Sequence, residues 1–196
     1  MPLYLYKGAS WSDLVTYTVP EGVRVIVGEA FNHCSELTSV TLPSTLLTLG
    51  KNSFINCGEL ESIVVATGNT VYDSRNNCNA VIETATNKLL AGCNETIIPN
   101  TVSIIGSYAF CGLFNLESIV IPNSVVEICS GAFRFCYELK SVVFMSNQYL
   151  SGVFKGSDGI EGAFSYCNSQ LSFYLNEIGE SNIIDDEISG TWDDAP

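Results

Sequence analysis

Residues 110–122, FCGLFNLESIVIP, and residues 123–133, NSVVEICSGAF, form one unit of a pattern that returns every 23 residues. Phe110 and Phe133 mark the start of two successive units. The same spacing separates other matched pairs: Pro20 and Pro43, Phe31 and Phe54, Cys34 and Cys57, and Pro99 and Pro122. Self-similarity at a period of 20 to 50 residues is typical of solenoids, in which each coil packs only on its neighbours. The sequence therefore predicts stacked coils that share one core.

Each unit contains one stretch with the alternation of a short strand. Ile119 and Ile121 alternate with Ser118 and Val120, and alternate residues of a strand point to opposite faces. Pro122 follows at once, and proline cannot continue a hydrogen-bonded ladder. We expect one short parallel strand in each coil.

The rest of the coil contains a corner and a tight turn. Gly50 and Gly106 follow the returning apolar segment, which suggests a corner with positive φ at these two positions. A small residue then precedes a phenylalanine once per coil, and we expect these rings to form one buried column. They are Phe31, Phe54, Phe110, Phe133 and Phe164.

Four of the eight cysteines occupy one slot, three residues after the phenylalanine: Cys34, Cys57, Cys136 and Cys167. Adjacent coils would bring such residues within reach of a disulfide. Leu113 fills the slot in another coil, which favours buried free thiols that pack as small apolar groups. Cys78 and Cys93 lie outside the slot, and they could pair or stay reduced.

The period is interrupted twice. The coil between Val65 and Ile98 is ten residues too long, and it contains a predicted hairpin with strands near residues 80–84 and 88–91. This insertion could be structural or could bind a partner. A glycine-rich excursion over residues 145–162 lacks the signature of a phosphate loop. From residue 176 onward seven acids occur without a base, which is typical of a solvated tail; the motif of a calcium loop is absent.

Three motifs resemble those of the BspA-like, or treponemal-type, leucine-rich repeat: L-x-x-I-x-I-P (residues 116–122), V-x-x-I-G (residues 102–106) and A-F-x-x-C (residues 132–136). The resemblance implies a right-handed leucine-rich-repeat solenoid, no catalytic residues, and a place in bacterial or protozoan surface proteins, some of which adhere to host extracellular proteins. We therefore expect a mainly β solenoid of about six 23-residue coils with two insertions. The expected boundaries are a cap over residues 1–18, the solenoid over 19–175 with its long coil at 66–98 and glycine-rich insertion at 145–162, and an acidic tail over 176–196.

Composition excludes several classes of function. A net charge of −13 with only eight Lys and Arg residues argues against binding to nucleic acid or an anionic membrane. No apolar run is long enough to span a bilayer, and the first residues lack the features of a secretory signal, so the chain is cytosolic or a processed piece of a longer protein. His33 adjoins Cys34, but adjacent side chains generally diverge, and no metal-ligand spacing occurs. We expect no cofactor, no metal and no catalysis.

The leading hypothesis is a non-enzymatic protein-binding module whose ligand is unknown, with an extracellular matrix protein as a candidate. The family resemblance implies that the module is at the cell surface or secreted. The alternative is a structural spacer in a larger surface protein. Strand register places Glu95 and Ser172 beside the ten candidate binding residues on the solvent side of the sheet. These ten are Ser39, Thr41, Ser62, Val64, Ile97, Ser118, Val120, Ser141, Val143 and Tyr174. The apolar members could form a contact ridge or reflect only the preference of valine for strands.

Overall fold

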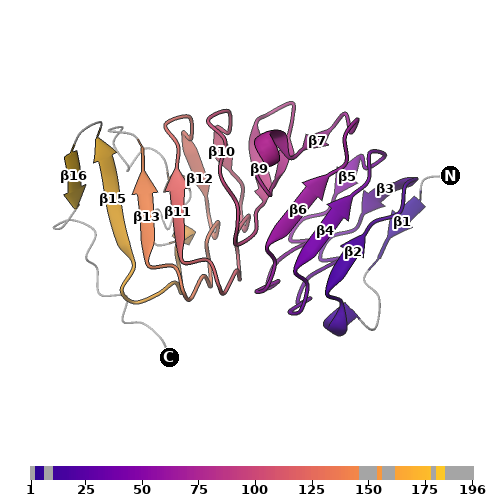
Figure 1. The fold of residues 1–196 in the computed structure, drawn as a ribbon, viewed down its shortest axis with the longest axis horizontal. Helices are drawn as coiled ribbons and strands as arrows, with labels where there is room; N and C mark the ends of the chain where they lie inside the picture. The colour runs from indigo at the N-terminus through magenta and orange to yellow at the C-terminus, as the bar shows by residue number, and fades with distance from the viewer. Residues whose placement is uncertain (1–2, 7–10, 146–153, 156–161, 178–179, 184–196) are drawn as a thin grey trace.

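The computed structural model describes residues 3–6, 11–145, 154–155, 162–177 and 180–183. Over these residues the chain winds into an elongated solenoid of stacked β coils, with its long axis horizontal in Figure 1. Helical structure in this part of the chain is limited to two 3-10 turns, η1 (Trp11–Asp13) and η2 (Arg75–Asn77), and to residues 162–163. The predicted mainly β solenoid is confirmed.

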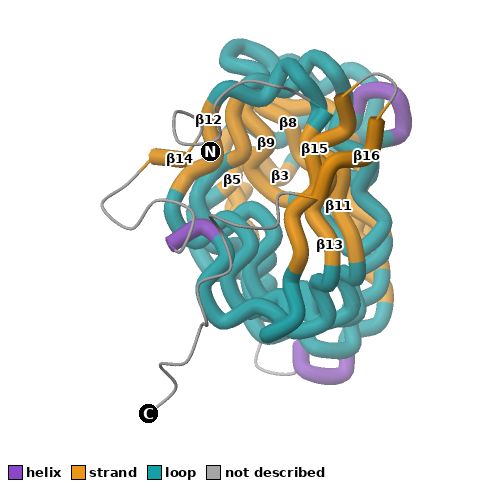
Figure 2. Tube along the Cα trace, turned by 90° about the vertical axis from the view of Figure 1, so that its left-hand side faces the viewer, coloured by secondary structure: helices purple, strands orange, loops and turns teal. Residues whose placement is uncertain are grey.

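The strands lie on two sides of the coil, which Figure 2 shows along the solenoid. We call one side the front sheet: β2 (Thr16–Thr18), β4 (Ser39–Leu42), β6 (Ser62–Val65), β11 (Ser118–Ile121), β13 (Ser141–Phe144), β15 (Ser172–Glu177) and β16 (Glu180–Ile183). We call the other the back sheet: β1 (Leu3–Leu5), β3 (Val23–Ile26), β5 (Thr48–Leu49), β7 (Tyr72–Asp73), β8 (Val81–Glu83), β9 (Lys88–Ala91), β10 (Ile104–Ile105), β12 (Glu127–Cys129) and β14 (Phe154–Lys155).

Alternation of burial explains the front strands. In β11 the side chains of Ile119 and Ile121 are buried, while those of Ser118 and Val120 are exposed. Front strands of neighbouring coils pair in parallel within β2-β4-β6 and within β11-β13-β15, as in the pairing of β11 with β13 over four consecutive residues. Stacking is required because one coil cannot bury its apolar edge alone.

The long coil, residues 66–98, divides both sheets into an N-terminal and a C-terminal half. The front sheet consists of β2-β4-β6 and of β11-β13-β15-β16, and the back sheet of β1-β3-β5 and of β14-β12-β10-β9-β8-β7. We call this division the seam. In Figure 1 the strands of the two halves are inclined to one another on either side of it.

The phenylalanine turns lie on a third side of the coil, which we call the turn face. Phe31 stacks on Phe54 with ring centroids 5.0 Å apart, and Phe133 stacks on Phe110 and on Phe164 at 4.8 Å each. The column is broken at the seam, where the long coil supplies no phenylalanine. A Cβ at Gly92 would overlap the Phe110 ring, so the backbone of the long coil lies directly against that ring. The predicted single column is therefore two stacks.

Positive φ occurs in this turn, but not at Gly50 and Gly106, where we expected it. A Cβ at Gly50 would overlap the backbone of Gly28, so close approach of the neighbouring coil selects glycine there. The left-handed positions lie further along, at two sites per coil. They are Glu29, Asn52, Tyr108 and Gly131 at the first site, and His33, Asn56, Gly112, Phe135 and Tyr166 at the second.

The C-terminal coils extend beyond the expected boundary. β15 continues to Glu177 and pairs in antiparallel fashion with β16, so paired strands reach into the segment assigned to the acidic tail. Residues 184–196 of that tail, and most of the glycine-rich insertion, lie outside the described residues. Within the insertion, β14 adds a parallel strand to β12.

Candidate functional site

The exposed face of the front sheet has two rows of side chains. Register places Val120 beside Val143 and Val143 beside Tyr174, and it places Thr41 beside Val64 in the N-terminal half. The second row is polar: Ser39 and Ser62 in one half, and Ser118, Ser141 and Ser172 in the other. The exposed fraction is 43% for Val64 and 51% for Val120. The structure thus brings nine of the ten candidate residues onto front strands, in two groups.

Ile97 is the exception. Ile97 is not part of a strand. Its side chain is 76% exposed, as expected for a residue on the solvent side. Its N–H donates to the carbonyl of Cys78, and the hydroxyl of Thr96 donates to the carbonyl of Asn79. An extra segment around Asn79 therefore lies against residues 96–97, and the expected strand at Glu95 and Ile97 does not form. The seam separates Val64 from Val120.

The inserted hairpin is integrated into the back sheet. β8 and β9 pair in antiparallel fashion, as predicted, and β9 also pairs in parallel with β10 of the following coil. Ile82 and Leu89 of the hairpin are fully buried. The hairpin is thus held both by strand pairing within the back sheet and by its buried side chains.

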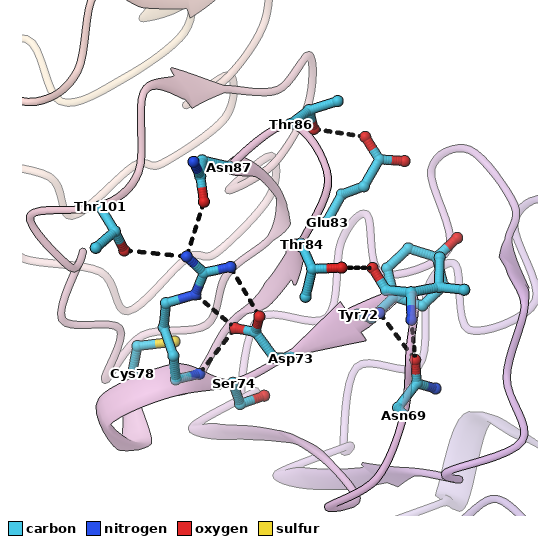
Figure 3. A network of polar contacts seen from close by, with 12 residues as sticks. Asn69, Tyr72, Asp73, Ser74, Cys78, Glu83, Thr84, Thr86, Asn87 and Thr101 are labelled. Atoms are coloured by element: carbon cyan, nitrogen blue, oxygen red, sulfur yellow. Dashed lines mark hydrogen bonds and ion pairs between the residues drawn. The ribbon is translucent and has the colours of Figure 1, made fainter.

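Polar contacts fix the tip of the hairpin (Figure 3). Arg75 forms an ion pair with Asp73 at 2.7 Å, and its guanidinium also donates to Asn87 at 2.8 Å and to Thr101 at 3.3 Å. The hydrogen bond to Asp73 raises the pKa of Arg75 above its ordinary value. Thr86 donates to Glu83 across the turn. These contacts hold the tip in one conformation, which a binding loop or a structural brace would both require.

All eight cysteines are free thiols, which agrees with the expectation for the slot and leaves Cys78 and Cys93 unpaired with each other. The slot thiols also have a polar role that the sequence did not suggest. Cys57 donates to the carbonyl of Phe31, Cys136 to that of Phe110, and Cys167 to that of Phe133, each at 3.1 Å. Each thiol thereby adds a second hydrogen bond to a carbonyl of the preceding coil that already accepts a backbone N–H. Leu113, which replaces cysteine in one coil, is buried as well.

The adjacent His33 and Cys34 do not form a nucleophilic pair. The His33 ring lies 3.2 Å from the Asn56 side-chain amide, whereas Cys34 is fully buried in the core. Among the described residues, no group of three or more His, Cys, Asp or Glu side chains is placed to hold a metal ion. In the same part of the chain, no helix has the length and apolar character needed to cross a bilayer.

The sequence profile of the BspA type leucine-rich repeat region matches residues 7–88 and 77–176, in six copies. The chain belongs to this family. No curated protein matches the chain. The family assignment accounts for the buried turn phenylalanines, the strand isoleucines and the slot cysteines, all of which occupy repeat positions.

Solved structures with similar folds are bacterial leucine-rich repeat proteins. A leucine-rich repeat protein from Eubacterium ventriosum is 19% identical, with 84% of this chain and 49% of that chain covered and a TM-score of 0.55. A leucine rich cell surface protein from Faecalibacterium prausnitzii is 19% identical, with 86% of this chain and 61% of that chain covered and a TM-score of 0.47. The pneumococcal vaccine antigen PcpA is 17% identical, with 85% of this chain and 64% of that chain covered and a TM-score of 0.45. The chain spans about half the length of the Eubacterium ventriosum protein. At this identity the likeness concerns the fold of the BspA type repeats. A leucine-rich repeat solenoid is typically a scaffold without catalytic activity.

Proposed function

We propose that the chain is a non-enzymatic binding module of a cell-surface or secreted protein, and that it holds a protein partner on the C-terminal half of its front sheet. The row formed by Val120, Val143 and Tyr174 supports this proposal. Its side chains lie in register on three neighbouring strands, with Ser118, Ser141 and Ser172 beside them. An apolar centre with an uncharged polar border is the usual anatomy of a protein interface.

Charge adds a second argument. All ten candidate residues are uncharged, although the chain contains 21 acidic residues. Interface centres are depleted of charge, whereas charges around them steer the partner. The net charge of −13 therefore favours a partner that is apolar at its centre and basic at its rim. An extracellular matrix protein with exposed basic segments has this chemistry.

The test is capture of extracellular matrix proteins on the immobilised chain, followed by substitution of the front row. Val120→Asp with Val143→Asp places two charges at the centre of the row, and we expect binding to fall by at least about 100-fold, because central residues dominate interface energy. Val126→Asp is the matched control. Val126 has the same exposed fraction as Val120, 51%, but it is not in a front strand, and this variant should bind as the unmodified chain does.

Two results would contradict the proposal. If changes at the hairpin tip, such as Thr86→Asp, remove binding that the double aspartate variant retains, the insertion is the binding surface. If a longer protein adheres to cells equally well with both front-row aspartates in place, the solenoid is a spacer that projects another domain.

A further inference from the structure

A cavity of about 470 Å³ lies at the seam, on the back and turn sides of the solenoid. Its walls come from two coils that are not consecutive in sequence, residues 49–55 on one side and residues 106–109 on the other, with Lys88, Leu90 and Ala91 of β9 between them. The long coil turns into its hairpin instead of supplying a phenylalanine turn. The cavity is where that missing turn would otherwise pack, and its volume is in the range of small-molecule sites.

The break leaves the backbone N–H of Phe54 without an acceptor among the described residues. In three other coils the phenylalanine N–H donates to the next coil: Phe31 to Ser53, Phe110 to Ala132, and Phe133 to Ala163. By position, Phe54 would donate to the carbonyl of Ala109. That carbonyl instead accepts the N–H of Gly92, and among the described residues no acceptor is found for the N–H of Phe54. Buried backbone donors are almost always paired, so this N–H is available to a ligand or to water.

The same residue offers an apolar surface. The ring of Phe54 stacks on Phe31 on one side only, and Phe54 is 6% exposed, whereas Phe31, Phe110 and Phe133 are fully buried. Leu49 and Leu90 add aliphatic wall to the cavity. A flat ring of a ligand could therefore continue the N-terminal stack, as the next phenylalanine does elsewhere at 4.8 to 5.0 Å.

The charge of the cavity is opposite to that of the chain. Lys51 and Lys88 line it, no acidic residue is among its lining residues, and neither lysine forms an ion pair with any described residue. In a protein with 21 acids and eight bases, two lysines that line one cavity without an ion pair to a described residue favour an anionic ligand.

We propose that this seam cavity binds a small aromatic carboxylate. The ring packs on Phe54 between Leu49 and Leu90, and the carboxylate accepts the N–H of Phe54 and pairs with Lys51 and Lys88. The site is distinct from the front sheet and requires no protein partner.

Phenylacetate is the probe, titrated into the whole chain while amide shifts are followed by NMR. We expect saturable shifts at the Asn52 and Phe54 amides with a dissociation constant of about 1 mM, which is reasonable for so small a ligand. The neutral analogue 2-phenylethanol and the ringless anion acetate should each bind at least about tenfold more weakly.

Lys51→Gln with Lys88→Gln should weaken phenylacetate binding at least about tenfold, while Lys140→Gln, which removes a charge outside the cavity, should change it by less than about twofold. Ser107→Trp fills the cavity from an exposed position and should abolish the shifts. The proposal is overturned if phenylacetate gives no saturable shift up to about 10 mM, if Lys140→Gln weakens it as much as the cavity variants, or if Ser107→Trp leaves it unchanged.

Discussion

Replacing Phe133 by alanine tests the stacking that holds the coils together. The ring is fully buried, and it packs against Phe110 and Phe164 with interplanar angles of 8° and 5°. Removing a buried phenylalanine costs about 3 to 5 kcal/mol, and stacked aromatic pairs add about 0.5 to 1.5 kcal/mol beyond area burial. With two partners and rigid coils on both sides, Phe133→Ala should cost about 4 to 5 kcal/mol.

Phe54→Ala is the internal comparison. Phe54 stacks on one partner, and its other side borders the seam cavity, so its removal breaks fewer packing contacts than the removal of Phe133. We expect a cost of about 2 to 3 kcal/mol. The difference between the two variants, about 2 kcal/mol, depends on the register of the coils and on the break in the column.

Urea unfolding followed by circular dichroism measures both costs. With the second tryptophan, Trp192, replaced by phenylalanine in every variant, fluorescence of Trp11, which stacks on Phe31, reports on the N-terminal half separately. Using both probes matters because a solenoid can unfold in parts. Equal losses for the two variants, or a loss below about 2 kcal/mol for Phe133→Ala, would refute the reasoning.

Two further predictions concern the backbone and the thiols. Gly112→Ala places a Cβ against Asn56 at positive φ and should lower the free energy of unfolding by about 2 to 4 kcal/mol. Gly68→Ala is also at positive φ but has nothing near its Cβ, so it should cost about 1 kcal/mol. Urea midpoints of the two variants measure the difference. Burial raises the pKa of Cys93 to about 11 from its ordinary value of 9.0, so the folded state holds a proton that the unfolded state loses, and stability should fall as pH rises from 9 to 11. Urea midpoints over this range should fall less steeply in Cys93→Ala, and an unchanged slope would contradict the assignment.

The sequence was sufficient for the repeated features that depend on buried volume, but it predicted one strand per coil, whereas the coils also contribute strands to the back sheet, and it missed the left-handed turn positions. Phe31 and Phe133 stack on phenylalanines of neighbouring coils, as the 23-residue period predicts, because stacking requires a side chain of the same volume at the same place in each coil. The register that aligns Val120 with Val143 follows from the same requirement. The function of that row was a prediction from the sequence, and it remains a proposal.

The structure of the seam could not be predicted from the repeat, because it depends on polar contacts that are specific to the long coil. Asn79 lies beside Thr96, and Arg75 lies beside Asp73 and Asn87. Neither arrangement has a counterpart in the other coils, as far as the structure describes them. One signal was available in the sequence: asparagine readily adopts positive φ, and the long coil has it at Asn76, Asn77, Asn79 and Asn87.

The left-handed turn positions were missed for a different reason. Glu29, Tyr108 and Phe135 have no intrinsic preference for positive φ, so composition does not reveal them. Hydrogen bonds between coils impose the conformation, as when the N–H of His33 donates to the carbonyl of Ile55. Tertiary contacts thus override local preference in the turn.

The bond from a slot thiol to the preceding coil also says where this scaffold can change length. The cysteine lies three positions after the phenylalanine both at Cys57 and at Cys167, although the coil ending at Phe164 is eight residues longer than 23. The thiol reaches its carbonyl only if that short arc keeps its length, whereas the stretch from the front strand to the next turn has no such constraint. New loops can therefore be inserted after a front strand. A single residue inserted between phenylalanine and cysteine would shift the thiol away from its carbonyl and break the register between the two coils.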